Sequence, residues 1–252
     1  MKAILISAGK GTRLLPLTEE LPKCLMPLNN DITVIEQQLR VLFSANIKDI
    51  IIILGYKVEM VEKKIFSLPF INKMNINIIY NPFFDVSNNL ISLWMARHFM
   101  DDDIITINGD DIFHADLINT LSADKNDIAL SISIKEEYDM DDMKIIHNNN
   151  TLQNVGKDIE FDKATGESIG IIKYTPKGAL ILRDKLDQMV RSKSNHQLFY
   201  LKAIQSIVDD GVKISTVEIP SEKWAEIDFH YDLEFVQRNF NRFKEVSSKI
   251  LS

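Results

Sequence analysis

The sequence has a single cysteine, no long apolar run and no excess of positive charge. Cys24 is the only cysteine among 252 residues, so the chain cannot form an internal disulfide, and this favours a reducing compartment such as the cytoplasm. The apolar run near the N-terminus covers only residues 3–6, which is too short for a secretion signal or a membrane span. A formal net charge of −7 argues against nonspecific nucleic-acid binding, which normally requires a basic face. We therefore expect a cytoplasmic protein that binds neither membranes nor nucleic acid.

Apolar and amphipathic segments alternate along the chain, and this pattern predicts a sheet covered by helices. Hydrophobic residues make up 45% of the sequence and charged residues 26%, so the chain can bury a full core. We expect an α/β fold: one domain over residues 1–252, with a mixed, mostly parallel sheet, helices on both faces and a small β-rich insertion at 136–161. Strands are predicted at 3–6, 49–54, 75–80, 104–107, 127–134, 168–174 and 212–219, and helices at 34–44, 58–66, 89–100, 116–121, 176–190, 198–209 and from Tyr231 onward.

A glycine-flanked loop, Ala-Gly-Lys-Gly-Thr-Arg-Leu, follows the first predicted strand. Open α/β sheets bind ligands at the carboxyl ends of their strands, which is where this loop begins. Its glycines can turn their amides toward an anion without a side chain in the way, and its arginine offers a fork of donors that matches phosphate oxygens. The loop has neither the ending of a P-loop nor the third glycine of a dinucleotide fingerprint, so it predicts another kind of triphosphate site. The nucleotide-binding candidates here are Ala8, Gly9, Gly11, Thr12 and Arg13.

This loop, together with the Pro-Lys that ends on Lys23, closely resembles the signature of the sugar-phosphate nucleotidylyltransferase superfamily. Members join a nucleoside monophosphate to a phosphorylated acceptor and release pyrophosphate. The Asn-Asn-x-x-Ser-Leu segment at 88–93, the Trp-x-Glu-Ile-Asp segment at 224–228 and the short length are similar to the CTP:phosphocholine cytidylyltransferase group of short bacterial type. The resemblance implies a Rossmann-like fold of the nucleotide-diphospho-sugar transferase type, with the insertion lying over the active site. It also implies CTP and a small phosphorylated acceptor as partners.

Two acidic segments supply candidate metal ligands. Asp110 follows a glycine at the end of a predicted strand, and Asp228 ends the late Trp-x-Glu-Ile-Asp segment. By resemblance to the superfamily, we assign these two aspartates to Mg²⁺, which prefers hard oxygen ligands and would bridge the nucleotide phosphates. Asp111 is the better candidate for capping the next helix, and Glu226 is expected beside the metal ligands or at the rim.

Four further residues are expected to contact the nucleotide base or the acceptor. Ser87 and Asn88 lie in a loop before a predicted helix, where their side chains can read a pyrimidine edge or cap the helix. Lys144 and Lys157 are similar to family lysines that approach the acceptor phosphate or the transferred α-phosphate. Most such lysines on a surface are simply solvated, and of the two we favour Lys157 as a ligand.

The acceptor pocket has three more candidates. Glu167 lies in a segment that resembles a family strand lining this pocket, and it can face a cationic head group. Trp94 and Trp224 are candidates for an aromatic cage around a quaternary ammonium, although helical spacing favours a core position for Trp94. A primary amine, as in 2-aminoethylphosphonate, would use carboxylates instead.

The expected chemistry is transfer of CMP from CTP to phosphocholine or a related phosphoamine or phosphonate. The acceptor phosphate is already an anionic nucleophile, so the catalytic residues Arg13, Lys23 and Lys157 act by positioning and charge neutralisation. A phosphorylated amino acid and a sugar 1-phosphate remain alternative acceptors. A noncatalytic nucleotide-binding subunit is the alternative from another class. A homo-oligomer is compatible with the sequence, which does not fix the oligomeric state.

Overall fold

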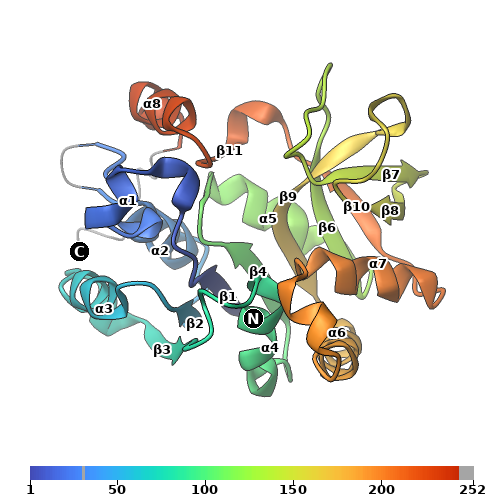
Figure 1. The fold of residues 1–252 in the computed structure, drawn as a ribbon, viewed down its shortest axis with the longest axis horizontal. Helices are drawn as coiled ribbons and strands as arrows, with labels where there is room; N and C mark the ends of the chain where they lie inside the picture. Colours follow the sequence, from blue (N-terminus) through green and yellow to red (C-terminus); the bar gives the residue numbers. More distant parts are fainter. Residues whose placement is uncertain (30–31, 244–252) are drawn as a thin grey trace.

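The computed structural model describes residues 1–29 and 32–243. Within this part of the chain a nine-stranded sheet runs through the molecule, with helices on both faces (Figure 1). The strand order is β3-β2-β1-β4-β9-β6-β10-β8-β7. The bounds are β1 Lys2–Ser7, β2 Asp49–Leu54, β3 Asn75–Tyr80, β4 Ile104–Asn108, β6 Ile128–Ser133, β7 Lys144–Asn148, β8 Thr151–Val155, β9 Gly166–Tyr174 and β10 Ser215–Glu218. Among these, β8 and β9 run against the direction of the others, so the sheet is mixed.

The central strands are apolar along their whole length because the sheet is covered on both faces. Alternate residues of β1 and β2 face opposite layers, since side chains alternate along a strand. Ala3 and Ile50 pack in one core with α2 (Val34–Ser44), α3 (Val58–Phe66) and α5 (Ala115–Ala123). Ile4 and Ile51 pack in the other core with α4 (Asn89–Met95), α6 (Pro176–Met189) and α7 (Leu201–Asp209).

A third apolar cluster joins an N-terminal segment to the last α-helix that the structure describes. Leu14, which follows the glycine loop, packs there with Leu233 and Val236 of α8 (His230–Asn239). Ile112 and Ile227 contribute from a small second sheet formed by β5 (Asp111–Phe113) and β11 (Trp224–Glu226). This packing holds the loop after β1 beside two segments that carry acidic side chains.

The β-rich insertion expected at 136–161 is part of the large sheet. Its hairpin, β7 and β8, continues the large sheet, because β8 pairs with β10 while β7 also pairs with β9 at Lys144–Glu167 and Ile145–Gly166. Figure 1 shows this hairpin at the end of the sheet away from β3. The pairing covers backbone groups that an edge strand would expose, and it places the start of β9 beside β7.

Several predicted boundaries were wrong, for local reasons. Asp111 does not cap α5: it begins β5 as a buried residue, and the His114 side chain accepts the hydrogen bond from the Asp116 amide instead. The helix predicted at 89–100 ends at Met95 and is followed by a short 3₁₀ helix, Arg97–Phe99. The helix predicted at 198–209 begins at Leu201. The closing helix is confirmed as α8, and the part of that prediction beyond residue 243 lies outside the described residues.

Candidate active site

A cavity of about 450 Å³ opens at the carboxyl ends of β1 and β4. Its wall includes the glycine loop after β1, the turn after β4, the loop before α4, the beginning of β9 and the beginning of α7. Open α/β sheets bind ligands in a crevice outside the carboxyl ends of their strands, and the position of this cavity matches that edge. In the described part of the chain, no helix has the length and apolar character needed to cross a membrane.

The glycine loop shapes one side of the cavity. Gly11 has a φ of 65°, in the left-handed region, and a Cβ there would lie 3.0 Å from the Lys23 Cβ. A Cβ on Gly9 would meet no atom within 4 Å, so this glycine leaves open space in front of the backbone. The amides of residues 9–11 donate no backbone hydrogen bond to another described residue. They are therefore available to an anionic ligand, together with the short 3₁₀ helix η1 (Thr12–Leu14) that carries Arg13.

Two cations from this region converge on the same carboxylate. Lys23 Nζ lies 2.8 Å from Asp110 Oδ2 and 2.7 Å from Asp228 Oδ1, and Arg13 Nη1 lies 2.5 Å from Asp228 Oδ2. Burial alone would lower the pKa of Lys23, but the charges of Asp110 and Asp228 outweigh it and raise the pKa. Burial likewise favours the neutral form of Asp228, whereas Lys23 and Arg13 lower its pKa. Lys23 and Asp228 therefore carry charge at neutral pH.

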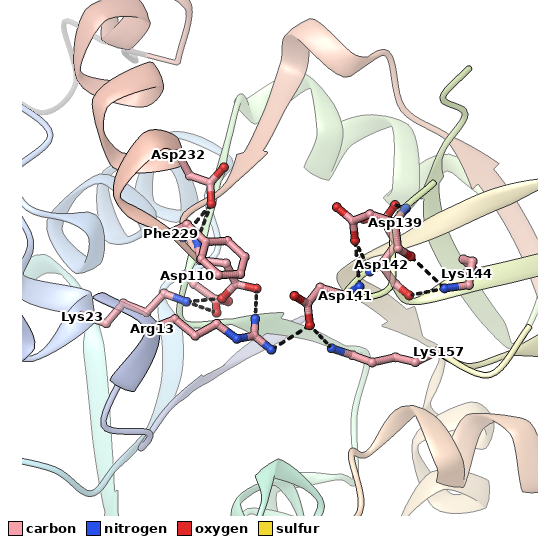
Figure 2. A network of polar contacts seen from close by, with 11 residues as sticks. Arg13, Lys23, Asp110, Asp139, Asp141, Asp142, Lys144, Lys157, Phe229 and Asp232 are labelled. Carbon is pink, nitrogen blue, oxygen red and sulfur yellow. Dashed lines mark hydrogen bonds and ion pairs between the residues drawn. The ribbon is translucent and has the colours of Figure 1, made fainter. Parts of the chain in front are cut away.

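Three carboxylates gather at this point. Asp110, Glu226 and Asp228 each place an oxygen so that the three atoms lie within 4.8 Å of one another. Pairing of β5 with β11 brings the segments together, and the Asp232 side chain accepts hydrogen bonds from the amides of Asp228 and Phe229 (Figure 2). Enclosure in the cavity and the charges of Asp110 and Asp228 raise the pKa of Glu226. An all-oxygen donor set of this kind fits a hard divalent cation such as Mg²⁺.

Lys157 faces these groups across the cavity through a third aspartate. Asp141, from the loop before β7, places Oδ1 3.2 Å from Arg13 Nη2 and 3.2 Å from Lys157 Nζ. Figure 2 shows Asp141 between the two cations. The structure thus brings together the predicted residues Arg13, Lys23 and Lys157 around the wall of one cavity.

Glu167, Ser87 and Asn88 also line the cavity. Burial raises the pKa of Glu167 to about 7, although Lys135 Nζ lies 2.6 Å from its Oε2 and acts in the opposite direction. Asn88 caps α4 through its side-chain oxygen, which accepts from the Asn89 amide, and Ser87 donates to the Phe83 carbonyl. These hydrogen bonds hold both side chains in the loop before α4.

Three expected acceptor residues lie away from the cavity wall. Trp94 packs against the core beside α6, donates from its indole nitrogen to Asp187 and lies under the Arg97 guanidinium at 4.0 Å. Trp224 packs against the opposite core with a buried indole nitrogen. Lys144 is buried under the loop at 135–143 and donates to the Asp139 carbonyl at 2.9 Å. The two tryptophans therefore form no cage around a ligand in this cavity.

Sequence reasoning missed several residues of the wall, including Asp141, Asp142, Met143 and Phe199. The acidic run Asp139, Asp141 and Asp142 was a visible signal, but an acidic run in a loop usually indicates solvated side chains. Glu226 was expected beside the metal ligands, and the structure places it within the carboxylate cluster.

Comparisons with known proteins agree with this geometry. The nucleotidyl transferase family model matches residues 2–143. A CTP:phosphoglutamine cytidylyltransferase of Campylobacter jejuni is 25% identical over 256 residues, which cover 93% of this chain and 98% of that protein. A choline-phosphate cytidylyltransferase of Streptococcus pneumoniae is 37% identical over 97 residues, which cover 38% of this chain and 39% of that protein.

Solved structures support the fold. The inositol-1-phosphate CTP transferase of T. maritima superposes with a TM-score of 0.81 at 19% identity, covering 98% of this chain and 97% of that one. A CTP:phosphocholine cytidylyltransferase of Streptococcus pneumoniae gives a TM-score of 0.77 at 22% identity, covering 95% of this chain and 98% of that one.

Proposed function

This chain belongs to the nucleotidyl transferase family, because the family model matches more than half of the chain, and from this we propose its reaction. We propose that the protein transfers CMP from CTP to a small phosphorylated acceptor. The observation that carries the proposal is the convergence of Arg13, Lys23 and Lys157 on a cavity that also holds a carboxylate cluster. Three cations suit a reaction between two anions, whose mutual repulsion must be neutralised. The names of the Campylobacter and Streptococcus relatives support CTP as the nucleotide.

In the proposed reaction, an oxygen of the acceptor phosphate attacks the α-phosphorus of CTP. A new oxygen–phosphorus bond forms, the bond between the α-phosphorus and its bridging oxygen breaks, and pyrophosphate leaves with the electron pair. Arg13 and the amides of residues 9–11 hold the leaving pyrophosphate, whereas Lys23 and Lys157 stabilise charge on the transferred group. The acceptor phosphate is ionised at neutral pH, so the reaction needs no side chain to remove a proton.

The carboxylate cluster would hold Mg²⁺ in this proposal, with Asp110 and Asp228 as the main ligands and Glu226 beside them. Bound Mg²⁺ would supply positive charge to the phosphates and keep several of its waters. Ser87 and Asn88 line the cavity beside α4, and in this proposal they contact the cytosine.

The acceptor that we propose is phosphocholine or a related phosphoamine or phosphonate. Because Trp94 and Trp224 lie outside the cavity wall, recognition of a cation there would depend on Glu167, Asp142 and the aromatic side chain of Phe199. Carboxylates at this position also suit a primary ammonium, so a phosphorylated amino acid is the second candidate. It is supported by the phosphoglutamine enzyme, which matches nearly the whole chain.

Pyrophosphate release in the presence of Mg²⁺ tests the proposal directly. CTP, UTP, dTTP, GTP and ATP would each be combined with phosphocholine, 2-aminoethylphosphonate, phosphorylated amino acids and glucose 1-phosphate. Turnover with CTP and one nitrogen-containing acceptor supports the proposal and identifies the acceptor. Turnover only with another nucleotide and glucose 1-phosphate would contradict it. Stabilisation by CTP without turnover for any acceptor would favour a nucleotide-binding subunit.

A further inference from the structure

The loop at 135–143 places its own anion between two cations that the proposed function assigns to phosphates. One oxygen of Asp141 lies 3.2 Å from both Arg13 Nη2 and Lys157 Nζ. Arg13 follows β1 and Lys157 follows β8, and the two side chains reach Asp141 from different sides (Figure 2). A carboxylate oxygen that accepts from two cations at once makes the kind of contact a phosphate oxygen makes.

The loop is anchored in a way that presents Asp141 to the cavity. The Asp139 side chain accepts hydrogen bonds from the amides of Asp141 and Asp142, at 2.7 and 3.0 Å. From below, the buried Lys144 donates to the Asp139 carbonyl at 2.9 Å. These contacts hold the turn in place through Asp139, its first residue. The carboxylate of Asp141 is left directed at Arg13 and Lys157.

We propose that Asp141 is a positioning residue that occupies the phosphate subsite before the nucleotide binds and is displaced by the nucleotide phosphates. This inference rests on the proposed function, because it takes Arg13 and Lys157 to be phosphate ligands. A triphosphate replaces the single carboxylate with more negative charge and more acceptor oxygens, so the exchange favours the nucleotide. Without Asp141, Arg13 would keep its ion pair with Asp228, whereas the ion pairs that link Arg13 and Lys157 through Asp141 would be lost.

Displacing Asp141 costs free energy, and this cost should weaken the binding of phosphate ligands. The Asp141 side chain is 45% exposed and that of Arg13 is 37% exposed, so solvent weakens both ion pairs. When a side chain of the protein occupies a subsite, the ligand can bind only to the molecules in which that subsite is open. The apparent affinity for the ligand is then the intrinsic affinity multiplied by the open fraction. With pairs of this strength, we expect removal of the Asp141 charge to tighten the binding of pyrophosphate by about three- to tenfold.

The first test measures pyrophosphate binding by isothermal titration calorimetry in the presence of Mg²⁺. Asp141→Asn removes the charge while keeping the shape, and Glu136→Gln makes the same change of charge at an exposed position in the same loop. We expect tighter binding for Asp141→Asn and unchanged binding for Glu136→Gln. Equal affinity in wild type and Asp141→Asn, or weaker binding in the variant, would overturn the role of Asp141 while leaving the proposed function intact. Absence of pyrophosphate binding in every protein would overturn both.

Steady-state kinetics provide a second test, because a purely structural role for Asp141 would not lower the KM for CTP. With CTP and the acceptor found by pyrophosphate release, Asp141→Asn should lower the KM for CTP by about three- to tenfold without raising kcat. A residue that only stabilises the loop would produce the opposite sign, since a disordered wall binds the nucleotide less well. An increased KM for CTP with a lowered melting temperature would therefore overturn the inference.

Discussion

The ammonium of Lys23 lies 2.7 Å from Asp228, although 205 residues separate the two in the sequence. The same ammonium lies 2.8 Å from Asp110. One largely buried cation therefore joins the segment after the glycine loop to the turn after β4 and to the end of β11. Its charge compensates two of the three clustered carboxylates, so the geometry of the proposed metal site depends on Lys23 as much as on its acidic residues.

Replacing Lys23 with methionine should destabilise the protein in a way that Mg²⁺ corrects. The variant removes the ion pair of Lys23 with Asp110 and leaves Asp228 with Arg13 alone. We expect the free energy of unfolding to fall by about 2 kcal/mol, since one side of a partly buried pair is lost. Divalent cations should restore much of this loss by taking the place of the missing charge. Urea unfolding with and without Mg²⁺ measures both effects.

Lys64→Met is a matched control for Lys23→Met. Lys64 pairs with the buried Glu36 at 2.5 Å, and neither residue lines the cavity. The control should also lose stability, but Mg²⁺ should not restore it. If Mg²⁺ raises the stability of both variants equally, the carboxylate cluster is not the site at which the ion acts.

Arg13→Gln and Asp110→Asn should each lower turnover at least about a hundredfold, because the first removes a cation that stabilises the reacting phosphates and the second removes a carboxylate that would hold Mg²⁺. Circular dichroism should show both variants folded, since Arg13 is partly exposed and Asp110 keeps its size and shape as asparagine. Lys163→Ala removes an exposed charge from the segment between β8 and β9 and should leave turnover unchanged. Near-normal turnover in either site variant would exclude that residue from the mechanism.

Glu167 should make stability depend on pH. Its pKa rises from 4.5 to about 7, mainly because the carboxyl is buried, so the folded protein retains a proton that the unfolded chain has lost across this window. The free energy of unfolding should therefore fall between about pH 4.5 and 7, by at most about 3 kcal/mol, and show no further loss from this group above pH 7. Urea unfolding of wild type and Glu167→Gln at several pH values tests this. An identical pH dependence in the two proteins would contradict it.

The sequence predicted the elements that depend on local patterns. Runs such as Asp-Ile-Ile-Ile-Ile-Leu identify strands that are buried on both faces, and β2 occupies the predicted residues. The glycine loop could be recognised because its chemistry requires small residues followed by a cation at a fixed spacing. Asp110, Lys23 and Asp228 could be assigned by resemblance, and the structure places Lys23 within ion-pair distance of both aspartates.

Features that depend on how distant segments meet could not be predicted in this way. Whether the hairpin of β7 and β8 caps the sheet or extends it depends on the free edges of β9 and β10, which no local pattern records. The ion pairs of Asp141 depend on the path of a loop. The buried position of Asp111 depends on the pairing of β5 with β11, whereas its place shortly before a predicted helix suggested a cap.

Gly11 should resist substitution for two separate reasons that matched variants can distinguish. Gly11→Ala forces a side chain into the left-handed region and places its Cβ 3.0 Å from the Lys23 Cβ, so we expect a loss of about 1 kcal/mol in stability together with reduced turnover. Gly211→Ala has the same backbone problem, with a φ of 83°, but a Cβ there meets no atom within 4 Å.

Gly211→Ala should therefore lose a similar amount of stability and keep full turnover. Gly9→Ala should show the reverse pattern, with normal stability and weaker CTP binding, because Gly9 lines the cavity and its Cβ would enter open space that the proposed phosphate site uses. Thermal unfolding and the KM for CTP, measured on all three variants, test the assignment. If Gly9→Ala binds CTP normally, the nucleotide does not approach the backbone at Gly9, and the phosphate site must lie closer to Arg13.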